Sequence, residues 1–173
     1  MKRKPISARI QTRAAQAVSP EAQLREAARE VFACWASGVT VLAVRDGPHV
    51  LAITATAVMP VSLEPPLILA SVGLNATVLP FLEIGRRFTV NLLAGDQRRL
   101  ASLFADPAPL ERSAFPPEGD PVLADALASL ACVVRRIHRE GDHDLVVASI
   151  EQVELHDERE PLIYFGRQYR GLR

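Results

Sequence analysis

The sequence predicts a mainly β domain, folded as a closed or nearly closed barrel with few helices. From Val39 onward the chain consists of short apolar runs rich in β-branched residues, and turn residues separate one run from the next. Six or seven such runs, with little helical patterning between them, are typical of a barrel. The length of 173 residues suits one compact domain with a sizeable core, so we expect one functional site.

One amphipathic helix is expected before the first strand. Ser19 is a suitable N-cap, Pro20 fits the first helical position and Glu21 places an acid in the first turn. Apolar residues then recur at helical spacing: Leu24, Ala27, Ala28, Val31, Phe32 and Trp35. Gly38 is expected to end this helix in the left-handed conformation.

The first two strands are expected to form a hairpin around the turn Asp46-Gly47-Pro48. Strands are predicted at residues 39–44, 49–57, 67–72, 88–93, 130–138, 145–155 and 162–167. Two short helices are predicted, one following residues 75–77 and running to about Arg86, the other from Asp96 to Phe104. The proline-rich stretch 106–121 is expected to be irregular.

The composition argues against several classes of partner. Twenty basic residues balance twenty acidic ones, so no overall field attracts nucleic acid or an anionic membrane. No apolar run reaches the roughly 18 residues that span a bilayer, which favours a soluble protein. The basic N-terminus, residues 1–18, is interpreted as a flexible arm in preference to a transit peptide, and residues 19–173 as the domain.

The cysteines and histidines predict neither a disulfide nor a metal site. Cys34 and Cys132 lie in separate apolar runs and are expected to be buried thiols in a reducing compartment, the cytoplasm. The four histidines lack the close spacing that is usual for metal ligands, apart from His138 and His143.

Three short segments could bind a ligand. The first contains Thr54, Ala55, Thr56, Ala57 and Val58, whose small and hydroxyl side chains suit a flat ligand but also an ordinary strand. The second contains Ser71, Val72, Asn75, Ala76 and Thr77, where the expected helix start could bind a phosphate or could be simple capping. The third is Gly141-Asp142-His143-Asp144, either a plain hairpin turn or a histidine beside a ligand.

Several common motifs are missing from the sequence. It contains no Gly-x-Gly-x-x-Gly fingerprint, no phosphate loop and no Gly-x-Ser-x-Gly elbow. Aromatic and basic residues are mixed in residues 164–170, as in RNA-binding sheets, but the neutral charge of the chain opposes that interpretation. A nucleotide would therefore have to bind in another manner.

Taken in order, these segments resemble the flavin reductase-like family, the reductase partners of two-component flavin monooxygenases. The matching stretches are residues 36–41, 54–58, 61–67, 71–72, 75–77, 88–93, 141–143 and 161–170, and together they span residues 32–170. Each motif is short, and the order and spacing of the whole set make the resemblance specific.

The resemblance implies an FMN-binding split β-barrel of Greek-key type, assembled as a homodimer with a flavin near the subunit interface. It implies reduction of FMN or FAD by NADH or NADPH, with the reduced flavin passed to a monooxygenase. By the same resemblance, Thr54, Ala55, Thr56, Ala57 and Val58 line the flavin, and Ser71, Val72, Asn75, Ala76 and Thr77 lie toward its phosphate. His143 and Tyr169 approach the nicotinamide. Hydride transfer then needs orientation and stacking more than a strong acid or base.

The sequence departs from the family pattern at two places. Met59-Pro60 removes a hydroxyl and a backbone N–H near the expected flavin N5 edge, and Leu74 replaces a basic residue, for which Arg86 or Arg87 could compensate. Arg139, Arg167 and Arg170 could meet the 2′-phosphate of NADPH. Two alternatives remain: a related split barrel acting on a corrin, a quinone or a pyridoxine phosphate, and a carrier or sensor of flavin or heme without turnover.

Overall fold

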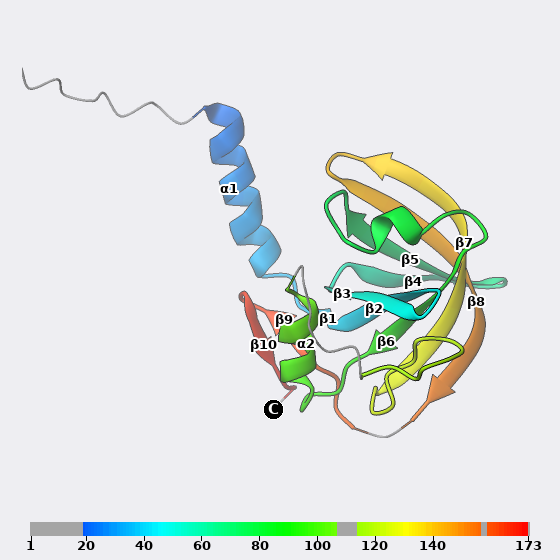
Figure 1. Ribbon diagram of the computed structural model, residues 1–173. Coiled ribbons are helices and arrows are strands. Elements are labelled where there is room, and N and C mark those ends of the chain that lie inside the picture. The colour runs from blue at the N-terminus through cyan, green and yellow to red at the C-terminus, as the bar shows by residue number, and fades with distance from the viewer. Residues whose placement is uncertain (1–18, 107–113, 157–158, 173) are drawn as a thin grey trace, which may run out of the picture. The chain divides into compact units, whose positions relative to one another are not determined.

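The structure is a computed structural model that describes residues 19–106, 114–156 and 159–172 (Figure 1). The predicted basic arm lies outside the described residues. The chain divides into two units, residues 1–32 and 33–173. No helix among the described residues is long and apolar enough to cross a bilayer.

The N-terminal helix α1 spans Pro20–Ala33 and begins as the sequence predicts. Ser19 Oγ accepts a hydrogen bond from the Ala22 N–H at 3.2 Å, which satisfies one of the free donors of the first turn. The predicted end at Gly38 is wrong. The helix ends at Ala33, because Ser37 and Gly38 form the short strand β1 (Ser37–Gly38) and pair with another strand in extended conformation.

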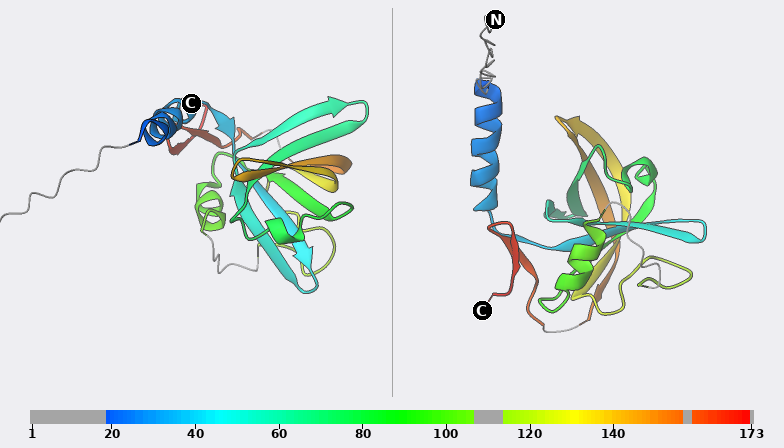
Figure 2. Two further views of the ribbon diagram at one scale, coloured as in Figure 1. Left: turned by 90° about the horizontal axis from the view of Figure 1, so that it is seen from above. Right: turned by 60° about the vertical axis from the view of Figure 1, so that its left-hand side comes forward.

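The second unit is dominated by a sheet of seven antiparallel strands, and the prediction of a mainly β fold is confirmed. The strands occur in the spatial order β3 (His49–Ala55), β2 (Thr40–Asp46), β6 (Arg87–Leu92), β7 (Ala128–Glu140), β8 (His143–Leu155), β5 (Pro66–Gly73) and β4 (Val58–Leu63). Figures 1 and 2 show the sheet curving into a barrel. β3 and β4 are consecutive in sequence but form opposite edges of the sheet, so the barrel is split between them.

A second sheet has three strands in the order β1, β9 (Ile163–Phe165) and β10 (Gln168–Arg170). The sequence predicts one strand over residues 162–167, and this is wrong. Gly166 and Arg167 both have φ of 60°, so they form a tight turn that folds the segment into a hairpin.

Two hydrophobic clusters stabilise the unit. The first fills the barrel, and its largest fully buried members include Leu42, Leu82, Phe88, Val90 and Val134. The second lies on the other side of β2 and includes Phe104 of α2 (Arg98–Phe104), Phe115, Leu93 and Leu162. The predicted helix over 96–104 is therefore confirmed, because its apolar face packs on the sheet.

Three further expectations are corrected. The predicted helix after residue 77 is only the 3₁₀-helix η1 (Leu79–Phe81), since Pro80 occupies its start and Gly85, with φ of 86°, turns the chain into β6. The strand β4 is missing from the prediction, because Pro60 is tolerated only on an edge strand such as this one. Cys34 is exposed, and only Cys132 is buried.

A buried polar network holds the irregular stretch 114–127 against the sheet. Asn91 of β6 is fully buried, and its amide donates to the Pro121 carbonyl at 3.3 Å. Its Oδ1 accepts from the Leu123 N–H at 2.9 Å and from the Ser129 hydroxyl at 2.8 Å. The stretch 114–127, part of the region predicted as irregular, is therefore bound to the sheet by a buried side chain that satisfies several groups at once, and the Thr89 hydroxyl adds a hydrogen bond to the Pro121 carbonyl at 2.6 Å.

Replacement of Asn91 by Ala should lower the free energy of unfolding by about 2–4 kcal/mol, because buried donors and acceptors lose their partner. Urea denaturation followed by circular dichroism measures this change. Ser102→Ala, on the exposed face of α2, is the matched control and should change it by less than about 0.5 kcal/mol. An equal effect of the two variants would mean that Asn91 does not anchor the stretch.

Candidate functional site

Two backbone hydrogen bonds bring the three predicted ligand-binding segments together. The Ser71 N–H donates to the Ala57 carbonyl at 2.9 Å, so the stretch between β3 and β4 lies beside β5. The Leu74 N–H donates to the Asp142 carbonyl at 3.0 Å, so the turn between β7 and β8 lies beside the end of β5. Segments separated by some seventy residues in sequence therefore meet at one edge of the barrel.

The pairing of β5 with β8 sets which side chains face outward at this edge. Gly73 pairs with His143, and Ser71 pairs with Leu145. The alternate residues of β5, Ala70 and Val72, are buried in the barrel core, and residues two apart in a strand share a face. Ser71, Gly73, His143 and Leu145 therefore form one outward-facing surface, which we call the outer patch.

His143 is the titratable residue of the outer patch. Its Nδ1 lies 2.7 Å from Asp142 Oδ1, and 45% of the His143 side chain is exposed. The opposite edge of the ring faces Gly73: a Cβ at Gly73 would lie 3.7 Å from His143 Nε2. The ring is thus held on one side, and its other nitrogen faces a residue without a side chain.

Asp144 follows His143 but points to the other face of β8. Its carboxylate binds the Arg139 guanidinium through Nε at 2.8 Å and Nη2 at 3.2 Å. The hydrogen bond from Arg139 lowers the pKa of Asp144 below its usual range. Arg139, one of the three arginines suggested for a 2′-phosphate, is therefore paired with a carboxylate in this structure.

The structure divides the first predicted segment between interior and surface. The Thr54 hydroxyl donates to the Ala101 carbonyl of α2 at 2.7 Å, and Ala55 is buried. Val58 packs against the first hydrophobic cluster. Ala57 is the exposed residue of the segment, Thr56 is half-buried like Thr54 and Val58, and the Ala57 carbonyl accepts the Ser71 N–H.

The second segment differs from its prediction in two ways. The Val72 side chain is only 1% exposed and faces the core, so it could meet a ligand only through its backbone. Asn75, Ala76 and Thr77 do not start an α-helix: they form a turn before η1, which has no side-chain cap. The predicted helix start is therefore wrong, whereas the phosphate role of these residues stays a prediction, and Asn75 and Thr77 are exposed next to the outer patch.

Tyr169 and His143 lie in different sheets of the chain. Tyr169 lies in β10, and its ring centroid is 5.5 Å from that of Tyr164 in β9. Figures 1 and 2 show the β9–β10 hairpin well separated from the turn that joins β7 and β8. Burial, and then the neighbouring Tyr164, raise the pKa of Tyr169 above its usual value.

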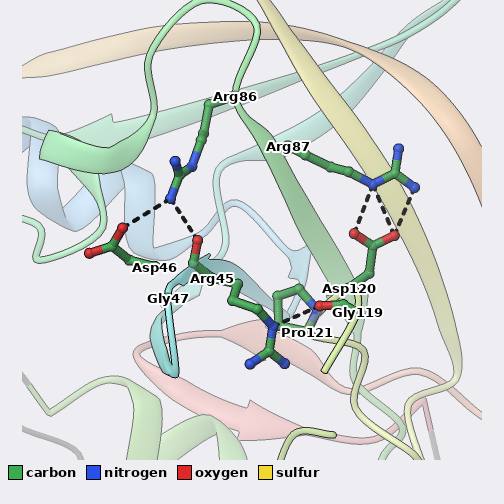
Figure 3. Close-up of a pocket in the computed structure, with 8 residues that line it drawn as sticks. All are labelled: Arg45, Asp46, Gly47, Arg86, Arg87, Gly119, Asp120 and Pro121. Carbon is green, nitrogen blue, oxygen red and sulfur yellow. Dashed lines mark hydrogen bonds and ion pairs between the residues drawn. The ribbon is translucent and has the colours of Figure 1, made fainter. Parts of the chain in front are cut away.

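A pocket of about 510 Å³ lies elsewhere, lined mainly by arginine and aspartate side chains (Figure 3). Arg86 donates to the Arg45 carbonyl at 2.6 Å and reaches Asp46 at 3.4 Å. Arg87 donates hydrogen bonds to the Asp120 carboxylate through Nε and Nη2 at 2.7–3.0 Å. The suggestion that Arg86 or Arg87 binds a flavin phosphate is therefore not supported, because both guanidinium groups are already engaged with carboxylate or carbonyl oxygens.

Among the described residues, no group of three His, Cys, Asp or Glu could hold a metal ion.

Comparison with known proteins agrees with this geometry. The flavin reductase like domain matches residues 32–173. The chain belongs to this family. It is 44% identical over 149 residues to the reductase component of 4-hydroxyphenylacetate 3-monooxygenase from Thermus thermophilus, which covers 86% of this chain and 97% of that protein. It is 35% identical to the FMN reductase (NADH) RutF of Stutzerimonas stutzeri, over 86% of this chain and 89% of that protein.

Solved structures of flavin reductases share the split-barrel fold. The flavin reductase PheA2 superposes with a TM-score of 0.78 and 32% identity, over 86% of this chain and 97% of that one. The NADH:FAD oxidoreductase SgcE6 of Streptomyces globisporus, solved with NAD and FAD fragments, gives a TM-score of 0.77 and 29% identity, over 90% of this chain and 96% of that one. The predicted family and fold class are therefore confirmed.

Two residues of the outer patch region were not predicted as site residues from the sequence. Gly73 looks like a strand residue until the register with His143 is known. Asp142 looks like an ordinary turn residue, although an aspartate directly before a histidine at a hairpin turn was a signal for a paired ring.

The Tyr164→Phe variant tests the environment of Tyr169, because Tyr169 is then the only tyrosine left in the chain. Burial should keep the pKa of its phenol above the ordinary value of about 10 even without Tyr164. Ultraviolet titration of the folded variant should therefore lie at higher pH than titration of the same variant in urea. Coincident curves would show that Tyr169 is solvated.

Proposed function

We propose that this chain is an NADH-dependent flavin reductase that supplies reduced flavin to a flavin-dependent monooxygenase. The observation that carries the proposal is the meeting of Ala57, Ser71, Gly73 and His143 at one edge of a flavin reductase-like barrel. The printed activities of the relatives support it, since they include an FMN reductase (NADH), an NADH-dependent flavin reductase and the reductase component of a monooxygenase.

The outer patch and its surroundings fit a flat ligand. Gly73 has no side chain and Ala57 has a small one, so an aromatic ring system can approach the backbone. The Ser71 hydroxyl and the exposed turn residues Asn75 and Thr77 offer polar groups at the same edge. A bound flavin supplies the hydride-accepting chemistry.

His143 orients the nicotinamide in this proposal, and the proposed hydride transfer needs no strong acid or base. The His143 imidazole is half-exposed and lies beside Gly73, which has no side chain. It can therefore stack on, or form a hydrogen bond with, a ring that binds on the outer patch. Correct placement of donor and acceptor rings accounts for most of the acceleration in such a reaction.

The finer specificity follows from the same contacts. We expect either FMN or FAD to be accepted, because relatives named for each of them match this chain. NADH is the expected donor, since Arg139 is paired with Asp144 and the relatives are named for NADH. Cytoplasmic location is supported by the two cysteines, which remain thiols.

A homodimer is proposed because one chain keeps the β9–β10 hairpin, which carries Tyr169, away from the β7–β8 turn beside His143. In a two-fold dimer, Tyr169 of one subunit can meet His143 of the other, and two equivalent sites form. The exposed apolar side chains of the edge strand β4, Met59 at 55%, Val61 at 49% and Leu63 at 86%, supply surface that such an assembly would bury. Residues 19–173 would form the reductase domain and residues 1–18 a basic arm.

Anaerobic oxidation of NADH and NADPH, followed at the flavin absorbance band, tests the reductase activity. Added FMN or FAD should be turned over, with NADH preferred. His143→Ala should slow reduction by at least about tenfold while changing flavin affinity less than about twofold, because the residue acts on the donor side. His49→Ala, an exposed histidine on β3, is the matched control. Equal loss of flavin binding and reduction would remove the donor-side role, and bound flavin that stays oxidised would indicate a carrier.

Mixing two impaired variants tests whether the site is shared between subunits. His143→Ala and Tyr169→Ala chains, unfolded together and refolded, should recover about a quarter of wild-type activity, since half of the dimers are mixed and each has one intact site. Each variant taken alone through the same procedure is the control. At equal total protein, activity no greater than the mean of the two controls would show that His143 and Tyr169 of different subunits do not form a shared site.

A further inference from the structure

The Asp142 side chain fixes one edge of the His143 ring. The two residues are adjacent in the β7–β8 turn, and Asp142 Oδ1 lies 2.7 Å from His143 Nδ1. The Asp142 backbone is itself held, because its carbonyl accepts the Leu74 N–H at 3.0 Å. The carboxylate is 95% exposed, so its contact with the ring does not result from close packing.

This contact determines which nitrogen carries the proton of a neutral ring. An ionised carboxylate has no hydrogen to donate, so Nδ1 must be the donor and Nε2 the nitrogen with the free lone pair. The same arrangement, in which an acceptor on one ring nitrogen sets the state of the other, orients histidines in many sites. His143 therefore presents Nε2 as a hydrogen-bond acceptor.

Nε2 faces the place where a ligand can enter. The residue paired with His143 on β5 is Gly73, at which an added Cβ would lie 3.7 Å from Nε2 and 4.0 Å from Cδ2. Gly73 does not have a positive φ, so no backbone strain requires glycine there. Its effect is to leave the acceptor nitrogen uncovered.

We propose that Asp142 is a positioning residue that holds His143 in the Nδ1–H form, with Nε2 aimed over Gly73 to accept a hydrogen bond from an amide N–H donor on the incoming ligand. This inference rests on the proposed function for the identity of that ligand: the carboxamide of the nicotinamide ring is the amide donor that a dinucleotide reductant brings. Asp142 touches neither reactant and acts through the ring.

The tautomer can be measured on the ligand-free protein, independently of any reductase activity. Long-range proton–nitrogen NMR spectra at about pH 9, where histidine rings are ordinarily neutral, distinguish the two forms. The His143 signals are assigned by their absence in His143→Ala. We expect the Nδ1–H form in the wild type and a shift toward the Nε2–H form in Asp142→Ala. Glu83→Ala, which removes an exposed carboxylate elsewhere, should leave the spectrum unchanged.

Stopped-flow reduction of bound flavin gives the second readout. In Asp142→Ala the dissociation constant for NADH should rise about three- to tenfold, with a smaller change in the limiting rate, because the ring is present but no longer fixed. Gly73→Ala should also weaken NADH binding, since its methyl group covers Nε2, yet it should keep the Nδ1–H form. Glu83→Ala should behave as the wild type in both measurements.

The outcomes separate this inference from the proposed function. An Nε2–H ring in the wild type, an unchanged tautomer in Asp142→Ala or an unchanged NADH dependence in that variant would each overturn the positioning role. Failure of the wild type to oxidise NADH would overturn the reductase assignment instead, while the tautomer experiment would still report on Asp142.

Discussion

The pairing register of β5 with β8 is the constraint on which the site depends. This register pairs Gly73 with His143 and Ser71 with Leu145. It also places Val72 and Val146 on the buried face of the sheet. Because side chains alternate along a strand, a slip of one residue would turn the core residues outward and bury the histidine. The hydrophobic core that stabilises the barrel therefore also fixes the position of the polar patch.

The same alternation gives neighbouring residues of β8 separate tasks. Asp144 points to the other face and is bound by Arg139, whereas His143 stays on the outer patch with Asp142. Two carboxylates so close in sequence could otherwise compete for one partner. Arg139 engages Asp144 and lowers the pKa of that carboxyl, whereas the exposed Asp142 carboxylate contacts the imidazole ring.

Much of the fold could be predicted from the sequence, because hydrophobic alternation and turn residues are local signals. The strands around Val41, Phe88 and Val146 were found for that reason. The errors occur where the deciding interaction is not local. Gly38 was predicted to end the helix, but it pairs with Ile163 of β9 in the structure. Cys34 was predicted to be buried because its neighbours are apolar, but it is exposed. Among the site residues, Ser71 and His143 were predicted, but the register that joins them through Gly73 could not be read from spacing.

The arrangement also explains why the chain lacks a recognisable catalytic dyad. In this reaction one bound ring transfers a hydride to another. The protein must therefore hold the two ligands face to face, and proton transfer is less important. Rigid strands are better suited to that task than loops, and the outer patch takes Ser71, Gly73, His143 and Leu145 from two strands joined by a continuous ladder. What remains adjustable is the direction of one imidazole ring at the end of the ladder. A carboxylate from the adjoining turn restrains it, because a hydrogen bond to Nδ1 limits the side-chain torsions that the ring can adopt.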